Sequence, residues 1–367
     1  MSSSVARHAL CASFALLFAL PFALYAQDQS RAEAILSGLS PIERVAQVFL
    51  ISVEGDSVFE PLEFLEDGRA ALPGGFILFS YNISGGFDGV KGYIDSAKEA
   101  YAANGSLAPY VAVDQEGGLV NRLRGITGDL PSQKEVAQSL SVAQAKALYS
   151  SQAKQLSSLG IALNLAPVSE AELESNHLFL KTRTFGKLPQ ACVYSFACVR
   201  AYEENGVATV VKHFPGNTNA DPHTGAVEIT LSRDEVFSHF VLPFAFALAA
   251  CPSAVLMSHA KVTQLDENPA CMSRFWIEDV LRGKLMFEGL VISDDIFMKA
   301  LAQNSPEQSA LEVLSSGTDV IMYSEKHFLS IAHFLLDEAQ KNPTFAKRLF
   351  DAEKRVVNFK LAKGIIE

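Results

Sequence analysis

The segment after residue 206 combines a basic pair with an Asp-Pro-His triplet. Lys212 and His213 follow the apolar run Val207–Val211, and Asp221 and His223 lie in the Asn- and Pro-rich loop beyond it. A carboxylate two residues from a histidine can orient the imidazole and stabilise its protonated form, as a general acid or base requires. Proton transfer is therefore the chemistry that this segment favours.

Two adjacent aspartates supply a second reactive group. Asp294 and Asp295 follow the apolar run Gly289–Ile292. Retaining glycoside hydrolysis needs a carboxylate that attacks the sugar carbon and a separate proton donor. The donor is usually a carboxylic acid, but a histidine serves when its pKa lies near the working pH. Asp294 as nucleophile and His223 as proton donor, oriented by Asp221, form such a pair.

Charged side chains follow two further apolar runs. Asp114 comes directly after Pro109–Val113, and Arg183 lies in the loop after Ile161–Leu165. With Lys212, these residues could bind sugar hydroxyls through charge-assisted hydrogen bonds. Taken singly, each also fits a helix cap or an ion pair across the rim of a fold.

A metal site built from His213, Asp221 and His223 is an alternative, but their spacing matches no usual ligand pattern. We therefore expect no metal and no cofactor. His259, which follows the run Ser253–Met257, fits a packed, hydrogen-bonded histidine and is assigned no role.

Eight apolar runs alternate with helical patterns, and the polar candidates follow these runs. The runs are Gln47–Val53, Gly74–Phe79, Pro109–Val113, Ile161–Leu165, Val207–Val211, Ser253–Met257, Gly289–Ile292 and Asp319–Tyr323. Apolar runs separated by helices predict parallel strands that are covered on both faces. Eight units predict an α/β fold with a single (β/α)8 TIM-type barrel, whose chemistry lies at the carboxyl ends of its strands. An open doubly wound sheet is the alternative.

The amino-terminal residues 1–26 have the pattern of a secretory signal peptide. Arg7 and His8 precede an apolar stretch, and Ala26 precedes polar residues. We expect cleavage after Ala26, a catalytic domain over residues 27–367 and a periplasmic or secreted location; an uncleaved anchor helix is the alternative. No later apolar run reaches the ~18 residues of a membrane span, so no stable membrane insertion is expected after cleavage.

Charge and cysteine usage exclude further classes of function. The net charge is −11 and no basic run stands out, which argues against a nucleic-acid partner. The cysteines after the signal segment form no C-x-x-C pair, so we expect them to be small core residues; they are Cys192, Cys198, Cys251 and Cys271.

The motifs of this chain resemble, in type and order, those of bacterial β-N-acetylhexosaminidases of glycoside hydrolase family 3. They are Asp114–Gly118 with Arg122, Arg183–Gly186, Lys212–Gly216 followed by Asp221-Pro222-His223, and Gly289–Asp295. The resemblance extends roughly from Ser40 to Tyr323. It implies a (β/α)8 barrel that removes terminal β-linked N-acetylglucosamine, often from peptidoglycan fragments, with retention through a glycosyl-enzyme.

The resemblance also implies a role for each matched residue. Asp294 would be the nucleophile, and His223 would be the acid/base, supported by Asp221. The residues that would hold the N-acetylglucosamine are Asp114, Arg122, Arg183, Lys212 and His213. Relatives that cleave glucosides take their acid from an additional carboxy-terminal domain, for which this chain has no room, so the histidine-loop branch is expected.

Three positions depart from the family's pattern. The loop Asn217–Ala220 is shorter than is usual, Pro222 replaces a serine and stiffens the loop, and Leu119 stands where the family often has arginine. A catalytically weak or inactive sugar-binding member is therefore one alternative. A phosphorylase is the other, because a histidine donor avoids the repulsion that a carboxylate would impose on phosphate; the sequence does not separate it from hydrolysis.

Overall fold

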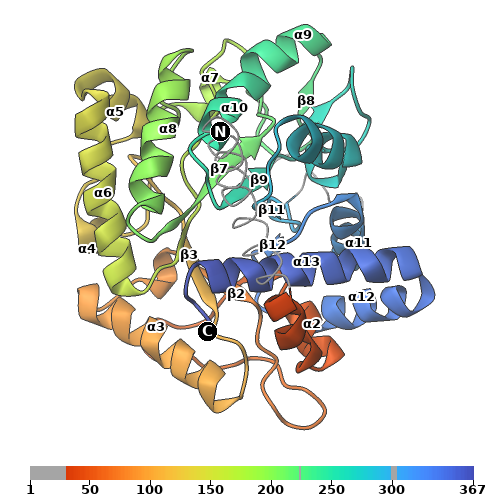
Figure 1. The fold of residues 1–367 in the computed structure, drawn as a ribbon. Coiled ribbons are helices and arrows are strands. Elements are labelled where there is room, and N and C mark those ends of the chain that lie inside the picture. The colour runs from red at the N-terminus through yellow and green to blue at the C-terminus, as the bar shows by residue number, and fades with distance from the viewer. Residues whose placement is uncertain (1–29, 223–224, 299–303) are drawn as a thin grey trace, which may run out of the picture.

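Eight parallel strands form a barrel in the computed structural model, which describes residues 30–222, 225–298 and 304–367 (Figure 1). In chain order the strands are β1 (Phe49–Ser52), β2 (Gly75–Leu78), β3 (Tyr110–Val113), β6 (Leu163–Asn164), β7 (Ala208–Phe214), β9 (Ala254–Met257), β11 (Leu290–Ile292) and β12 (Ile321–Tyr323). Consecutive strands pair with one another, β12 also pairs with β1, and a parallel bridge from Ile292 to Val320 joins the two ends of the sheet. The predicted barrel is confirmed, and the open sheet is excluded.

The strands are buried on both faces because their side chains alternate between two apolar environments. Leu50 and Ile77 belong to the cluster inside the barrel, whereas Phe49, Ile51 and Phe76 belong to clusters beneath the helices. The period of two residues along a strand produces this division. It explains why the strands read as continuously apolar runs rather than as alternating ones.

Helices cover the outside of the barrel (Figure 1). They are α3 (Gly86–Ala103), α5 (Gln133–Ser139), α6 (Val142–Leu159), α8 (Gln190–Glu203), α9 (Arg233–Glu235), α10 (Leu242–Leu248), α11 (Pro306–Ser316), α12 (Leu329–Lys341) and α13 (Pro343–Ala362). Local sequence sets their ends: α6 begins at a capping box between Ser141 and Gln144 and ends at Gly160, whose φ of 91° favours glycine.

The connection between β1 and β2 differs from the predicted alternation of strands and helices. Residues 53–74 form no helix and contain only a short antiparallel bridge between Phe64 and Ala70. This segment contains two prolines and several glycines, which disfavour a helix. The neighbouring outer face is covered instead by α2 (Pro41–Ala46) and α12, with the Phe49 ring 5.0 Å from that of Phe328.

Two helical segments outside the barrel contain wide turns. The π-helix η2 (Val236–Val241) lies between α9 and α10, and the π-helix η4 (Phe275–Lys284) lies between β9 and β11. The two segments meet in one aromatic cluster, because the buried Trp276 of η4 stacks with Phe237 of η2 at 6.2 Å. Periodicity of apolar residues alone does not separate π from α turns.

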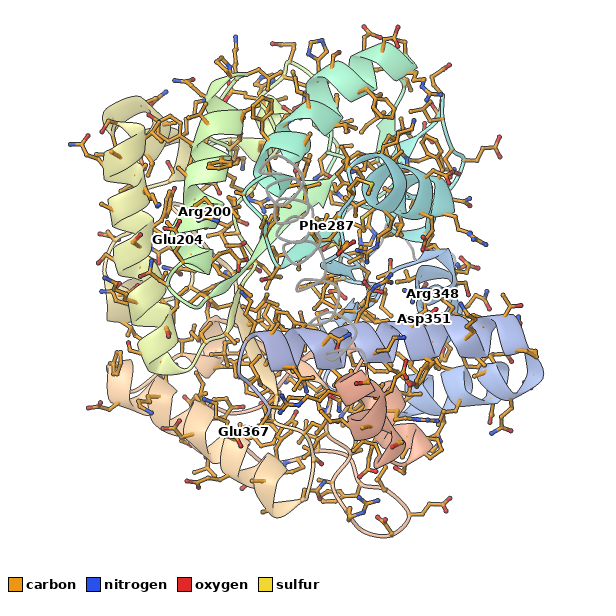
Figure 2. The ribbon with its side chains drawn as sticks, viewed as in Figure 1. Arg200, Glu204, Phe287, Arg348, Asp351 and Glu367 are labelled. Carbon is orange, nitrogen blue, oxygen red and sulfur yellow. The ribbon has the colours of Figure 1, made fainter. Side chains whose placement is uncertain are left out.

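Helix α13 packs against the amino-terminal end of the barrel, where its Phe359 ring lies 5.5 Å from that of Tyr110, the first residue of β3. Arg348, labelled in Figure 2, donates a hydrogen bond of 2.9 Å to the buried carboxylate of Asp319, just before β12. Further along α13, the ammonium of Lys360 is fully buried and donates a hydrogen bond to Gln47 Oε1 at 2.7 Å. Burial lowers the pKa of Lys360 to about 7.

The four cysteines of the described residues are free and are not all in the core. Cys192, Cys198 and Cys271 are buried, as expected, but Cys251 is exposed in the turn after α10, so the expectation was wrong for that residue. Among the described residues, no helix combines the length and apolar character that a membrane span requires. The predicted signal peptide lies outside the described residues.

The buried Lys360 predicts a specific pH dependence of stability. A lysine in the unfolded chain has a pKa near ~10.4, so between pH 7 and that value the unfolded state binds more protons than the folded state. The free energy of unfolding therefore rises with pH across this window, and the penalty of the buried charge is fully present below it. We expect Lys360→Met to gain more stability over the wild type at about pH 6 than at about pH 9, by about 1 kcal/mol or more, in guanidinium titrations.

Lys347→Met on the same helix is the control, because the Lys347 side chain is 81% exposed. Its difference from the wild type should be the same at both pH values. A pH-independent difference for Lys360→Met would contradict the expectation.

Candidate active site

Three predicted site residues continue the inward-facing positions of their strands. The residues that point into the barrel from β3, β7 and β11 are Tyr110, Ala112, Ala208, Val210, Leu290 and Ile292. Asp114, Lys212 and Asp294 each stand two residues beyond the last of these, so the same alternation directs their side chains over the barrel interior. This is the carboxyl end, where TIM barrels carry their chemistry.

Lys212 is the centre of a buried ion-pair network. Its Nζ lies 2.6 Å from Asp114 Oδ1 and 2.7 Å from Glu116 Oε1. Arg183 adds two hydrogen bonds to the carboxylate of Glu116, from Nε at 2.8 Å and Nη2 at 2.9 Å. The side chains of Lys212 and Glu116 are 4% and 1% exposed. The structure thus brings together Asp114, Arg183 and Lys212 around a glutamate to which the sequence analysis gave no role.

The charges of the network are mutually stabilised. Burial would raise the pKa of Glu116, but the positive charges of Lys212 and Arg183 outweigh it and hold that pKa well below its usual value. Burial would likewise lower the pKa of Lys212, and the carboxylates of Asp114 and Glu116 raise it instead. Lys212, Arg183 and Glu116 are therefore all charged at neutral pH.

A second buried carboxylate, Glu170, orients His213. It accepts hydrogen bonds from His213 Nδ1 at 2.8 Å, from the Asn217 backbone N at 2.6 Å and from Asn217 Nδ2 at 3.1 Å. Because the carboxylate accepts from Nδ1–H, the Nε2 atom of His213 is directed elsewhere and can contact a ligand. Sequence reasoning missed Glu170; its position shortly after β6 was the only available signal.

The shortened loop after β7 is tied to its neighbours by two asparagines. Asn217 Oδ1 accepts from Ser258 Oγ at 2.9 Å, beyond β9. Asn219 accepts from the Leu178 backbone N at 2.8 Å and donates to the Glu174 carbonyl at 2.9 Å, in the loop after β6. These contacts fix the loop up to the predicted proton-transfer pair.

The proton-transfer pair itself is only partly described. Asp221 is exposed, and its backbone carbonyl accepts from the Gly225 N–H at 3.3 Å. His223 lies outside the described residues, so its role stays a prediction. Among the described residues, no three His, Cys, Asp or Glu side chains are grouped to hold a metal ion. The alternative metal site includes His223 and is therefore not tested.

Asp294 lies at the end of β11 and is 8% exposed. Its Oδ1 accepts a hydrogen bond from the backbone N–H of Asp295 at 2.9 Å. The Asp295 carboxylate is held in turn by the N–H groups of Phe297 at 3.0 Å and Ser324 at 3.1 Å. The backbone that carries Asp294 is therefore anchored to the segment after β12.

Arg122 is not part of the Lys212 network. It follows the hairpin of β4 (Gln115–Gly117) and β5 (Val120–Asn121), and its Nε is buried without a hydrogen bond in the part of the chain that the structure describes. Gly118 has a φ of 57°, and a Cβ there would lie 2.5 Å from the Ser132 Cβ. The close approach of the hairpin to α5 therefore requires glycine.

Comparison with known proteins identifies the family. Residues 68–359 match the model of the glycosyl hydrolase family 3 N-terminal domain. The chain belongs to glycosyl hydrolase family 3. A β-hexosaminidase of Stenotrophomonas maltophilia (strain K279a) is 30% identical over 260 residues, which are 68% of this chain and 75% of that protein. The resemblance inferred from the motifs is thus confirmed.

Solved structures of family 3 members have the same fold. The β-N-acetylhexosaminidase from Beutenbergia cavernae superposes with a TM-score of 0.78 at 28% identity, covering 89% of this chain and 99% of that one. A fungal multi-domain β-N-acetylglucosaminidase superposes with a TM-score of 0.79 at 26% identity. The superposition covers 88% of this chain but only 39% of the longer fungal chain.

The buried position of Glu116 predicts a large cost for neutralising it. Glu116→Gln leaves two cations without their shared anion, and breaking a buried ion pair from one side costs about 3–5 kcal/mol. We expect the free energy of unfolding, measured by guanidinium titration, to fall by about that amount. Asp95→Asn is the control: the Lys91–Asp95 pair is 45% and 44% exposed, and its loss should cost less than about 1 kcal/mol. Equal losses would contradict this account.

Proposed function

We propose that this family 3 protein is a retaining exo-β-N-acetylglucosaminidase that cleaves terminal β-linked N-acetylglucosamine through a glycosyl-enzyme intermediate. The observation that carries the proposal is that the barrel mouth holds two separate charged groups, the Lys212 network and the Asp294 carboxylate. Lys212, held between Asp114 and Glu116, occupies one side. Asp294, an inward-facing carboxylate outside this network, stands two residues beyond β11. The names of the hexosaminidase relatives support the choice of sugar.

Unused donors and acceptors around Lys212 support binding of a ligand rich in hydroxyl groups. The ammonium has three N–H donors, of which Asp114 and Glu116 receive two. Arg183 has five, of which Glu116 receives two. Asp114 Oδ2 and His213 Nε2 are further polar atoms for the same ligand. The network fixes these groups before the sugar arrives, which lowers the cost of binding it.

The packed interior of the barrel supports action at a chain end. Ala112, Val210 and Ile292, the inward-facing residues just below Asp114, Lys212 and Asp294, are fully buried. A sugar that enters the barrel mouth therefore meets a closed floor, as in TIM barrels generally. A terminal sugar seated on this floor would be removed one residue at a time, which agrees with the action that the family resemblance implies.

The proposed reaction uses Asp294 as the nucleophile and His223 as the acid and then the base. Asp294 attacks the anomeric carbon as the glycosidic bond breaks, and His223 gives its proton to the departing oxygen. Water then attacks the same carbon, His223 takes the proton from it, and the bond to Asp294 breaks. The hydrogen bond from the Asp295 N–H to Asp294 Oδ1 leaves the other carboxylate oxygen for the attack.

Hydrolysis of a chromogenic β-N-acetylglucosaminide tests the proposal. We expect Asp294→Asn to lower kcat by about 10⁴-fold, because no other group supplies the nucleophile. His223→Ala should lose activity on substrates with poor leaving groups and recover much of it with a dinitrophenyl group, which needs no proton. Asp351→Asn is the control and should behave like the wild type, because the Asp351 side chain is 37% exposed and pairs with the exposed Lys347.

Three outcomes would contradict the proposal. Full activity of Asp294→Asn would refute the mechanism. Sugar binding by the wild type without turnover would indicate a sugar-binding family member. Release of the sugar 1-phosphate that depends on added phosphate would indicate a phosphorylase.

Export and a peptidoglycan-derived substrate belong to the same proposal. They rest on the signal-peptide pattern of residues 1–26 and on the family's implication, and they would place the enzyme in the periplasm or outside the cell. We expect the mature protein, isolated from the producing cells, to begin at Gln27 when its mass is measured. Replacing both Leu16 and Leu17 with arginine interrupts the apolar stretch. We expect that variant to stay inside the cell and to keep its residues from Met1 onward. A wild-type protein that keeps residues 1–26 would contradict cleavage.

A further inference from the structure

His259, after β9, contacts two partners that the proposed reaction does not use. The side chain is buried, with 2% of the residue exposed. Its Nε2 lies 3.0 Å from the backbone carbonyl oxygen of Asp295, and its Nδ1 lies 3.3 Å from the sulfur of Cys271. Asp295 is the residue directly after the proposed nucleophile.

The register of β9 and β11 brings His259 to this place. Val255 pairs with Val291 and Leu256 with Ile292, and the same register continued three residues further sets His259 opposite Asp295. Val255 and Val291 both pack outside the barrel, beneath the helices. By the same alternation His259 and Asp295 stand behind the inward-facing Asp294 rather than beside the sugar.

The partners of His259 determine which ring nitrogen carries its proton. A carbonyl oxygen only accepts, so Nε2 must be N–H and donate to Asp295. In that tautomer Nδ1 has a lone pair, and the Cys271 thiol is the donor that it requires. Burial, together with the charge of Asp294, raises the pKa of the Cys271 thiol, which therefore keeps its proton.

Asp295 connects this histidine to the nucleophile. Its N–H donates to Asp294 Oδ1 at 2.9 Å, and its carbonyl accepts from His259. Its carboxylate is held by Phe297 and Ser324. That carbonyl also accepts from the Met298 backbone N–H at 3.1 Å, so His259 is one of its two donors. Without His259, the carbonyl would keep only this local bond and would lose its link to the segment after β9.

We propose that His259 is a positioning residue for the nucleophile: held as the Nε2–H tautomer by the Cys271 thiol, it fixes Asp295 and thereby the hydrogen bond that aims the Asp294 carboxylate. The inference rests on the proposed function of Asp294. It assigns His259 no contact with the sugar and no proton transfer, so its loss should affect the chemical step and not the affinity for substrate.

Paired substitutions of His259 separate positioning from packing. His259→Phe keeps a ring of similar size but removes both hydrogen bonds, whereas His259→Gln retains an N–H that can reach the Asp295 carbonyl. We expect kcat of His259→Phe to fall about 10- to 100-fold with KM within about twofold of the wild type, as for a small misplacement of a reacting group. His259→Gln should recover most of kcat. Equal kcat for His259→Phe and the wild type would overturn the proposal.

Cys271 supplies a second pair that leaves the imidazole in place. Cys271→Ser keeps a donor for Nδ1 and should retain wild-type kcat. Cys271→Ala removes the donor, so the His259 imidazole can adopt either tautomer. We expect kcat to fall while KM stays unchanged. Equal kcat in the two variants would contradict the role of the thiol. His239→Phe, an exposed histidine of η2, is the control.

The tautomer can be measured without any activity. Nitrogen-15 NMR of the full chain distinguishes an Nε2–H from an Nδ1–H imidazole, and the signal of His259 is assigned by its loss in His259→Gln. We expect the Nε2–H form in the wild type and in Cys271→Ser. An Nδ1–H tautomer would overturn the inference even if the enzyme is active. A wild type that does not hydrolyse the substrate would instead refute the proposed function, and the NMR result would still decide the tautomer.

Discussion

The ammonium of Lys212, buried between two carboxylates, is the constraint on which the rest of the site depends. A buried charge without a partner is costly, so Lys212 requires Asp114 and Glu116, and Glu116 requires Arg183 as well. These residues come from the ends of β3 and β7 and from the loop after β6. Because these ion pairs link the residues to one another, the three strands are tied together at the end of the barrel where a substrate would enter. The site is therefore built before a ligand arrives.

Further polar contacts continue this connection around the barrel. Glu170 joins the loop after β6 to His213 and Asn217, and Asn217 reaches Ser258 beyond β9. His259 then reaches the segment after β11, which the Asp295 carboxylate joins to that after β12. The Lys212 side and the Asp294 side of the barrel mouth are thus parts of one hydrogen-bonded rim. The apolar interior below it supplies rigidity, because close-packed side chains resist displacement.

The barrel could be predicted from the sequence because strands covered on both faces leave a record of eight apolar runs. Asp114, Lys212 and Asp294 could be placed at the carboxyl ends of the strands because they follow three of those runs. Glu170 could not be assigned in this way, because its partner His213 is 43 residues away and the contact exists only after folding. The loop between β1 and β2, the π turn around Trp276 and the exposed Cys251 were missed for a related reason, since tertiary packing rather than local pattern decides them. His223 lies outside the described residues and stays a prediction.

The central claim is that Asp294 forms a covalent bond with the sugar. A slow substrate, an N-acetylglucosaminyl fluoride with a second fluorine at C5, would let this intermediate accumulate. Proteolysis and mass spectrometry would then locate the attached sugar. The account predicts one sugar per chain, on Asp294 and not on Asp295. Release of fluoride without any protein-bound sugar, or attachment at another residue, would contradict it, and the former would indicate that the substrate's own N-acetyl group is the nucleophile.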